Sequence, residues 1–207
     1  MSQFWDARYA GKDYLFGEEP NAFLARQAGR LKAGGRALSI ADGEGRNGVW
    51  LARQGLDVHA VDSSAVAQEK ARRLATAHGV SLHYELANLL EWTWPEEAYD
   101  VVAGIFIQFM NPDERTRMFS GICRALKPGS LLLLEGYTPR QLEFRTGGPS
   151  QVENLYTEAL LRTAFVGLNI LELHSYEAEV QEGTGHRGMS ALIDLVAHKP
   201  LAISSRR

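Results

Sequence analysis

Short apolar runs alternate with stretches of helical periodicity along most of this chain. The apolar runs have the length and composition of strands, and they lie at residues 36–41, 57–62, 81–86, 99–110 and 130–137. The first, fourth and fifth of these runs are apolar almost throughout. That character is typical of strands that are buried on both faces of a parallel sheet.

The stretches between these runs carry helix signals. Prolines or polar capping residues stand near their starts and glycines near their ends, which predicts helices that begin near Pro20 and cover 46–54, 64–78 and 112–126. Strands that alternate with helices favour an open α/β architecture. We therefore expect a Rossmann-like sheet of five parallel strands with helices on both faces.

The pattern changes after Tyr137. A polar loop at 139–150 precedes a predicted helix around 154–165, and two further apolar runs follow near 168–180 and 189–198. The turn between them, QEGTGH, is short, and strands joined by so short a turn pair antiparallel. The sequence therefore predicts seven strands in all, five of them parallel and two in a C-terminal antiparallel hairpin.

Length, charge and cysteine content exclude several classes of protein. A chain of 207 residues corresponds to about one domain, and a net charge of −3 argues against broad binding to nucleic acid or anionic lipid. The single cysteine, Cys123, excludes an internal disulfide framework and a multi-cysteine metal site. No apolar run approaches the roughly 20 residues that span a bilayer, so we expect a cytoplasmic protein.

The loop after the first predicted strand carries the candidate chemistry. Gly43, Gly45 and Gly48 form a G-x-G-x-x-G pattern between a strand and a helix, and Asp62 ends the second strand. In the dinucleotide fingerprint such a loop holds a pyrophosphate and the acidic residue binds ribose hydroxyls. Taken literally, the pattern predicts a nicotinamide-dependent oxidoreductase, and that alternative stays open here.

Two acidic residues beside the first glycine of this pattern favour a different cofactor. Asp42 and Glu44 place carboxylates where a pyrophosphate would lie, and like charges at that range oppose binding. S-adenosylmethionine carries a sulfonium and an ammonium group beside its adenosine, and both groups favour nearby carboxylates. We therefore expect this cationic cofactor, with Asp62 on its ribose.

The order of these features resembles the class I S-adenosylmethionine-dependent methyltransferases. The resemblance covers about residues 36–137 and includes the glycine loop, Asp62, the Asn88-Leu89 pair and the Leu-Lys-Pro-Gly step at 126–129. The flanks are similar to the tellurite-resistance and thiopurine methyltransferase-like group. That narrower likeness rests on WDxRY at 5–9, YxFGxxPNxFL at 14–24, GRN at 45–47 and TGGP at 146–149.

The chain departs from the family pattern at three positions. The usual acidic residue inside the first strand is Ser39, the first glycine of the loop is Ala41, and the acidic residue after the third strand is Asn88. The side-chain carbonyl of Asn88 can still accept from the amine of adenine. The missing acid leaves open whether Asp42 or Glu44 holds the methionine ammonium group.

The resemblance implies a cofactor site at the carboxyl ends of the parallel strands. The residues expected there are Tyr14, Ala41, Asp42, Gly43, Glu44, Gly45, Arg46, Asp62, Ser63, Asn88, Leu89 and Ile105. The N-terminal aromatic residues either fold over the cofactor as a lid or pack as ordinary core.

The acceptor side is less defined by the sequence. Methyl transfer needs alignment above all, and a general base only where the acceptor is protonated; the candidates for catalytic roles are Tyr14, Gln108, Tyr137, Arg145 and His186. The resemblance implies a small-molecule acceptor such as a thiol, selenium or tellurium compound, without nucleic acid or membrane partners. A non-catalytic module that binds S-adenosylmethionine is a further alternative.

No metal site is expected, because His174, His186 and His198 are too scattered for a local ligand pattern.

We expect one methyltransferase domain at 1–200, as a monomer or weak homodimer. Within it, 1–35 form the N-terminal lid and helices, 36–138 the cofactor-binding core, and 139–200 the acceptor-side loop, helix and hairpin. Residues 201–207 are expected to form a tail.

Overall fold

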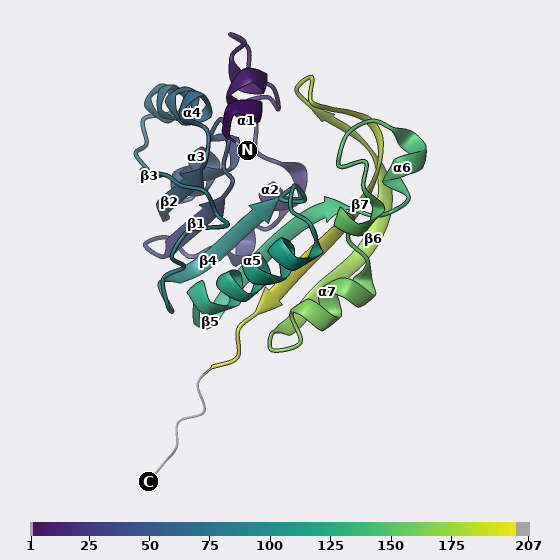
Figure 1. The fold of residues 1–207 in the computed structure, drawn as a ribbon. Helices are drawn as coiled ribbons and strands as arrows, with labels where there is room; N and C mark the ends of the chain where they lie inside the picture. The colour runs from purple at the N-terminus through teal and green to yellow at the C-terminus, as the bar shows by residue number, and fades with distance from the viewer. Residues whose placement is uncertain (1, 202–207) are drawn as a thin grey trace.

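Seven strands form one sheet in the order β3-β2-β1-β4-β5-β7-β6 in the computed structural model, which describes residues 2–201 (Figure 1). The strands are β1 (Arg36–Ile40), β2 (Asp57–Asp62), β3 (His83–Leu86), β4 (Tyr99–Ile105), β5 (Leu126–Tyr137), β6 (Asn169–Glu182) and β7 (His186–His198). The first five strands pair in parallel, and β7 pairs antiparallel with both β5 and β6. The predicted fold class is confirmed.

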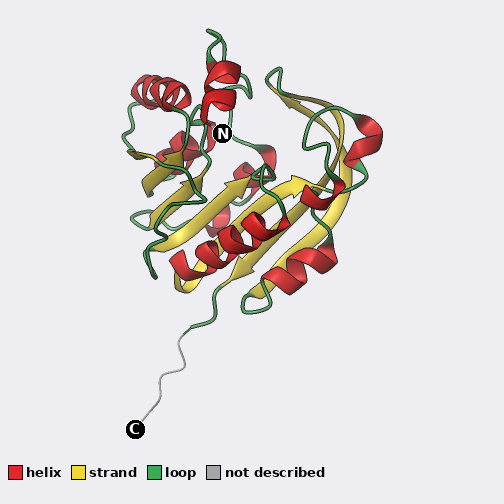
Figure 2. Cartoon of the chain, viewed as in Figure 1, coloured by secondary structure: helices red, strands yellow, loops and turns green. Residues whose placement is uncertain are grey.

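The helices lie on both sides of this sheet (Figure 2). They are α1 (Ser2–Tyr9), α2 (Ala22–Arg26), α3 (Arg46–Arg53), α4 (Ala65–Ala77), α5 (Pro112–Ala125), α6 (Gln141–Phe144) and α7 (Glu158–Ala164), with 3-10 turns η1 (Ala28–Arg30) and η2 (Val152–Asn154). Four of these elements, α1, α6, η1 and η2, were given no range from the sequence.

Several element boundaries differ from those predicted. The helix expected at 154–165 begins at Glu158, because the Thr157 side chain accepts from the N–H of Leu160 and caps it there. The helix expected near Pro20 begins at Ala22, because Asn21 caps it in the same way. β4 ends earlier than expected, at Ile105, whereas β5, β6 and β7 are longer than expected.

The sheet separates two hydrophobic cores. Side chains alternate across each strand, so Leu38 of β1 packs with α5 and α7 on one face, while its neighbour Ala37 packs with α2 and α3 on the other. Both faces of the central strands are therefore covered, as the apolar runs predicted. The loops at the carboxyl ends of β1, β2 and β4 lie at one edge of this double layer, where the site described below is found.

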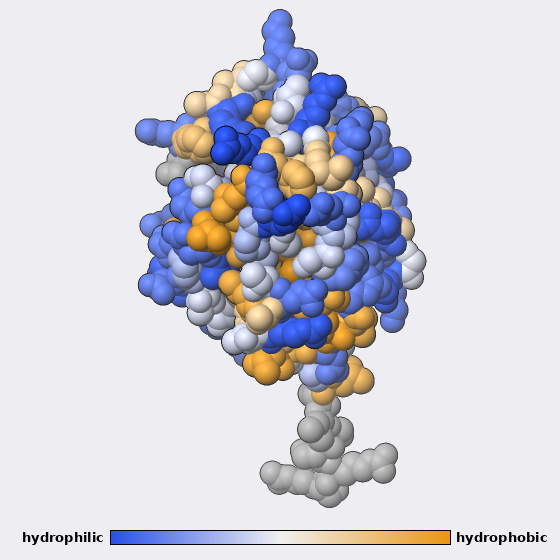
Figure 3. Space-filling view, turned by 90° about the vertical axis from the view of Figure 1, so that its right-hand side faces the viewer, coloured by the Kyte–Doolittle hydropathy of each residue, from blue (hydrophilic) through white to orange (hydrophobic). Residues whose placement is uncertain are grey.

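The outer strand β6 is protected by charge. It is the last strand in the sheet order and carries Glu172, Glu177 and Glu179 among its solvent-facing residues. Charged side chains on an edge strand oppose pairing with another chain. Figure 3 shows this side of the molecule as mostly hydrophilic, with smaller hydrophobic patches.

Within residues 2–201, no helix is long and apolar enough to cross a membrane. The predicted tail at 201–207 lies outside the described residues, apart from Leu201.

One glycine inside α5 generates a test of the packing. A Cβ atom at Gly121 would lie 2.4 Å from the Trp94 ring, so we expect Gly121→Ala to lower the free energy of unfolding by about 1–3 kcal/mol through overpacking. Gly29→Ala is the matched control, because nothing lies within 4 Å of its Cβ position. Urea titrations measure both; equal stability of the two variants would contradict this packing.

Candidate functional site

A cavity lies at the carboxyl ends of the parallel strands. It encloses about 860 Å³, part of which is open to solvent. The loop that follows β1, the end of β2, the segment 87–89 after β3 and Ile105 at the end of β4 form its walls. The aromatic residues Trp5, Tyr9 and Phe16 of the N-terminal segment also line it. Four strand ends and the N-terminal segment thus meet around one space.

Most of the expected cofactor residues line this cavity. They are Ala41, Asp42, Gly43, Glu44, Arg46, Asp62, Ser63, Asn88, Leu89 and Ile105. Tyr14 and Gly45 do not line it. The Tyr14 hydroxyl donates to the Lys70 carbonyl at 3.0 Å. Gly45 has a φ of 93°, and a Cβ there would lie 2.6 Å from the Cβ of Ala71. Its lack of a side chain lets α3 begin close to α4.

Sequence reasoning missed three further residues that line the cavity. Gly17 and Asn47 stand within the YxFGxxPN and GRN fragments, next to residues that were selected, and Ala87 precedes Asn88. The signal for the first two was membership of the same fragment. Ala87 carries no polar group, so only its position in the chain could have indicated it.

Asp42 has one carboxylate oxygen without a partner. Its Oδ1 accepts from the Ser39 hydroxyl at 2.6 Å and from the Gly48 N–H at 2.8 Å, whereas Oδ2 is buried and makes no hydrogen bond. Burial raises the pKa of Asp42 to about 6 in spite of these two donors. The cavity therefore presents a desolvated acceptor that a cationic group can satisfy.

The third glycine of the loop makes room for this carboxylate. A Cβ atom at Gly48 would lie 2.5 Å from Asp42 Oδ2, so any side chain there would displace the acid. Ser39 occupies the strand position where the resembling family has an acidic residue, and it anchors Asp42 instead. The Ser39 hydroxyl thus holds the carboxylate of Asp42, three residues later in the chain.

Glu44 has no such free oxygen. It forms a buried ion pair with Lys70 and accepts from the Leu15 N–H at 2.7 Å. Lys70 also donates to the Asp13 carbonyl at 2.7 Å. Glu44 therefore fastens the N-terminal segment to the glycine loop, and of the two acids considered from the sequence, Asp42 is the one left with an open oxygen.

Asp62 is fixed by two backbone donors. The N–H groups of Gly43 and Ser64 donate to its two oxygens, each at 2.8 Å, and burial raises its pKa. Each carboxylate oxygen retains a further lone pair, so hydroxyl groups in the cavity can still be bound. On the neighbouring segment, the side-chain oxygen of Asn88, Oδ1, accepts from the Leu90 N–H at 3.2 Å. This hydrogen bond orients the side-chain amide of Asn88.

Arg46 contributes a cationic group with a free nitrogen. Its Nη2 donates to Glu182 Oε2 at 2.7 Å, while Nη1 is buried without a partner. Burial alone would raise the pKa of Glu182, but the neighbouring His186 and Arg46 lower it to about 2. An unpartnered carboxylate oxygen and an unpartnered guanidinium nitrogen thus belong to one cavity. A ligand that carries both an ammonium and a carboxylate group satisfies both.

A second cavity adjoins the first and encloses about 1070 Å³, again partly open. The two cavities share Trp5, Phe16, Phe106, Phe109 and His186. Of the candidate catalytic residues, Gln108, Tyr137 and His186 line the second cavity. Arg145 is exposed at the end of α6 with a φ of 57° and lines neither cavity.

His186 lies between the two cavities. Its ring contacts those of Phe16 and Phe106 at centroid distances of 4.4 and 4.5 Å. Its Nδ1 lies 3.7 Å from Glu182 Oε2 and makes no hydrogen bond. Burial lowers the pKa of His186, so the imidazole is neutral at neutral pH and can accept a proton.

Tyr137 and Gln108 play different parts in the second cavity. The Tyr137 ring stacks on Phe106 at 4.6 Å, its hydroxyl has no partner, and burial raises its pKa. The hydroxyl is therefore a neutral donor. The Gln108 amide donates to the carbonyls of Tyr137 and Asn154 at 2.9 and 3.2 Å. It thus holds the backbone around the cavity.

The N-terminal segment and the β6–β7 turn hold each other in place. The Leu15 carbonyl accepts from the N–H groups of Thr184 and Gly185 at 2.9 and 2.8 Å. Asn21 donates to both Glu135 and Glu182. Through these contacts, elements from the two ends of the chain close around the same pair of cavities.

The family comparison matches the central part of the chain. Residues 37–129 match a family model described as a methyltransferase domain. A tRNA (uracil(54)-C(5))-methyltransferase from Pyrococcus abyssi (strain GE5 / Orsay) is 29% identical over an alignment of 103 residues that covers 42% of this chain. The chain spans about a quarter of the length of that relative, since the match covers 25% of it.

Solved structures share the fold at low identity. A protein solved in work on the conversion of a disulfide bond into a thioacetal group during echinomycin biosynthesis has a TM-score of 0.79 and 21% identity, over 99% of this chain and 95% of that one. The N-methyltransferase NodS from Bradyrhizobium japonicum WM9, in complex with S-adenosyl-l-homocysteine, has a TM-score of 0.73 and 14% identity, over 96% and 98%. TehB from Haemophilus influenzae has a TM-score of 0.70 and 15% identity, over 96% and 66%.

The desolvated acid generates a prediction about stability. The folded protein holds the pKa of Asp42 at about 6, above its ordinary 3.8, so the ionised carboxylate destabilises the fold increasingly as the pH rises from about 4 to 6. Asp42→Asn removes this cost and keeps an oxygen for Ser39 and Gly48. We expect it to raise the free energy of unfolding by up to about 3 kcal/mol at pH 7.5, and by far less at pH 4.

Urea titrations at both pH values check this prediction. Asp100→Asn is the control with the opposite sign, because the Arg36 N–H and Lys127 lower the pKa of Asp100 although its partial burial would raise it. That variant should lose stability at pH 7.5 and recover it relative to the native chain as the pH falls. A loss of stability in Asp42→Asn at pH 7.5 would contradict the account.

Proposed function

We propose that this chain, whose residues 37–129 match a methyltransferase domain, is a class I S-adenosylmethionine-dependent methyltransferase and that it methylates a small-molecule acceptor. The observation that carries the proposal is the pair of unpartnered groups in the first cavity, the Asp42 oxygen and the Arg46 nitrogen. Their opposite charges match the ammonium and carboxylate ends of the methionine moiety.

The chain's own residues fit the other parts of the cofactor as well. Asp62 would bind the ribose hydroxyls, and the Asn88 amide would bind adenine between apolar contacts from Leu89 and Ile105. Trp5 and Phe16 would cover the bound molecule, in keeping with the expected lid. When bound, S-adenosylmethionine supplies an electrophilic methyl group, so the protein has to align the acceptor and exclude water.

The same geometry disfavours the nicotinamide alternative. A pyrophosphate in the glycine loop would face the open oxygen of Asp42, whose two available donors, the Ser39 hydroxyl and the Gly48 N–H, are already used on Oδ1. Repulsion inside a desolvated site is stronger than in water. The zwitterionic end of S-adenosylmethionine relieves both unpartnered groups, whereas a dinucleotide leaves Asp42 unsatisfied.

We place the acceptor in the second cavity, with His186 as its general base. In the neutral tautomer that carries its proton on Nδ1, His186 points that N–H at Glu182 Oε2, 3.7 Å away. Its Nε2 then has the lone pair that takes the acceptor's proton. A thiol, with an ordinary pKa near ~8.5, is mostly protonated at neutral pH and needs such a base. We therefore propose a thiol, or a related selenium or tellurium compound, as the acceptor class.

The unpartnered Tyr137 hydroxyl and the His186 imidazole favour an enzyme over a module that only binds the cofactor. Both lie in the cavity next to the cofactor cavity, where a bound acceptor would satisfy them. The single cysteine and the modest net charge agree with a cytoplasmic protein. We propose that it works there as a monomer or weak homodimer.

Calorimetry with S-adenosylmethionine, S-adenosylhomocysteine and NADH tests the cofactor assignment. We expect the two sulfur compounds to bind and NADH to give no heat. Asp42→Asn should weaken S-adenosylhomocysteine binding about 10- to 100-fold, since it removes a charge-assisted hydrogen bond, while Asp100→Asn should not. Binding of NADH together with silence of the sulfur compounds would overturn the proposal.

The raised pKa of Asp42 adds a pH dependence to this binding. Ligand binding favours the ionised acid, so the affinity for S-adenosylhomocysteine should fall as the pH drops below about 6. In Asp42→Asn that dependence should disappear. Persistence of the same profile in the variant would assign the titration to another group.

Kinetics with an identified acceptor test the base. We expect His186→Gln to lower kcat/KM for a thiol about 10²- to 10⁴-fold, with S-adenosylhomocysteine affinity changed far less. The rate should rise with pH as His186 loses its proton. Because the pKa of His186 is lowered, the native rate should reach its plateau at a lower pH than an ordinary histidine would give. His198→Gln, at the far end of β7, is the matched control. Equal rates in the two variants would remove His186 from the mechanism.

A further inference from the structure

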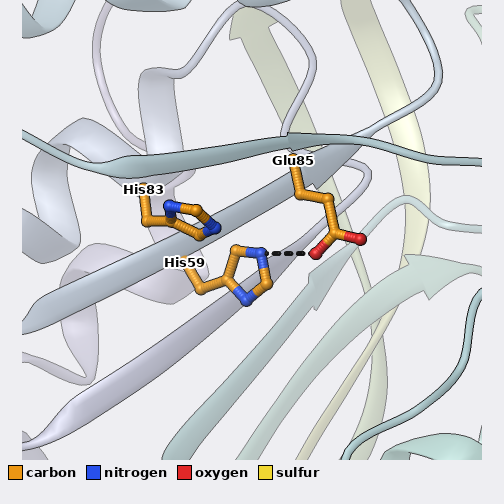
Figure 4. Close-up of side chains that lie close together, drawn as sticks. All are labelled: His59, His83 and Glu85. Carbon is orange, nitrogen blue, oxygen red and sulfur yellow. Dashed lines mark ion pairs between the residues drawn. The ribbon is translucent and has the colours of Figure 1, made fainter.

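Two histidines and a glutamate meet on the neighbouring strands β2 and β3, and none of the three lines either of the cavities described above. His59 on β2 and His83 on β3 are register partners in adjacent parallel strands, and Glu85 follows two residues later on β3. Residues two apart in a strand share a face, so all three side chains project from the same face of the sheet. Figure 4 shows them pointing toward one another.

The distances among these groups are close to those of a metal site. One ligand atom from each residue lies within 4.8 Å of the others, and His59 Nε2 lies 3.0 Å from Glu85 Oε2. Around a tetrahedral ion with bonds of about 2.0–2.2 Å, ligand atoms lie about 3.4 Å apart. His83 is exposed, so a rotation of its side chain can supply the remaining approach.

The buried histidine has a nitrogen that the protein leaves unused. His59 is buried, and its Nε2 makes no hydrogen bond in spite of its closeness to Glu85. With the ring proton on Nδ1, which lies 2.6 Å from the Tyr99 hydroxyl, Nε2 carries the lone pair. A buried lone pair beside a carboxylate oxygen is satisfied by a cation held between them.

In His59 and in Glu85, the other polar atom of the side chain is already held by an aromatic residue. His59 Nδ1 lies at hydrogen-bond distance, 2.6 Å, from the Tyr99 hydroxyl. The Trp92 indole donates to Glu85 Oε1 at 2.7 Å. Such outer partners orient metal ligands and fix the histidine tautomer. They leave Nε2 of His59 and Oε2 of Glu85 facing the same point.

We propose that His59, His83 and Glu85 bind one Zn²⁺ ion. Two imidazoles and one carboxylate form a ligand set that suits Zn²⁺. The three residues line a hollow of about 960 Å³ that is open to solvent, which gives the ion an entry path and leaves a coordination position for water. Arg36 lines the same hollow, but its guanidinium lies over the Tyr99 ring and 3.8 Å from Asp57.

The position of the ion suggests what it does. Ala87 and Asn88 line both this hollow and the first cavity, and they directly follow β3, an edge strand of four residues. An ion shared by β2 and β3 would fasten that short strand and the segment that carries Asn88. The site is therefore stabilising rather than catalytic, and it does not depend on the proposed methyl transfer.

Calorimetric titration with zinc chloride, after removal of metals by a chelator, tests the proposal on the full chain. We expect one Zn²⁺ per chain in the native protein and in His78→Ala, whose exposed histidine lies at the end of α4. His83→Ala should bind at least about 10-fold more weakly. Because His83 is exposed, circular dichroism should show this variant folded.

Glu85→Gln and Co²⁺ give independent readouts. The amide keeps the size of the side chain but loses the charge, so this variant should also bind Zn²⁺ more weakly. Co²⁺ in the native protein should give the visible absorption of a tetrahedral site, and His83→Ala should lose it. Absence of Zn²⁺ binding in the native chain, or equal affinity in the native chain and His83→Ala, would overturn the proposal.

Discussion

A buried carboxylate with one unsatisfied oxygen is the constraint on which this site depends. Asp42 is held from one side only, by Ser39 and Gly48, and its other oxygen is enclosed without a partner. Burial of an unpaired charged group is costly, so the ligand-free fold carries a local destabilisation that a cationic ligand removes. The nearby Arg46 likewise has a buried guanidinium nitrogen, Nη1, without a hydrogen-bond partner. The zwitterionic ligand that we propose would give each of these two groups a partner.

The rest of the structure positions and encloses this pair. The parallel strands bring the glycine loop, Asp62 and Asn88 to one edge of the sheet, whereas the antiparallel hairpin brings His186 back to the same place from the other end of the chain. Glu44, which lies beside Asp42 in sequence, is used for a different purpose, because Lys70 and the Leu15 N–H occupy it. Glu44 thus fastens the N-terminal segment, and Asp42 is left as the acid that we propose binds the ligand.

The sequence was sufficient for those features that depend on local pattern. Apolar periodicity gave the seven strands, and the glycine loop with Asp62 located most of the first cavity. Contacts between distant segments could not be predicted from it. Asp42 and Glu44 both flank Gly43 in the sequence, and they differ only in the structure, where Lys70 and the Leu15 N–H occupy Glu44. His59 and His83 are likewise far apart in sequence and meet through strand register alone. The N-cap at Thr157 shortened a helix that periodicity alone extended.

The most direct measurement of the central claim is a double-mutant cycle between Asp42 and the ligand's ammonium group. Calorimetry would compare S-adenosylhomocysteine with its deaminated analogue on the native chain and on Asp42→Asn. The account predicts that the native chain prefers the ammonium-bearing ligand about 10- to 100-fold and that Asp42→Asn binds the two ligands almost equally. An undiminished preference in the variant would show that another group holds the ammonium and would contradict the account.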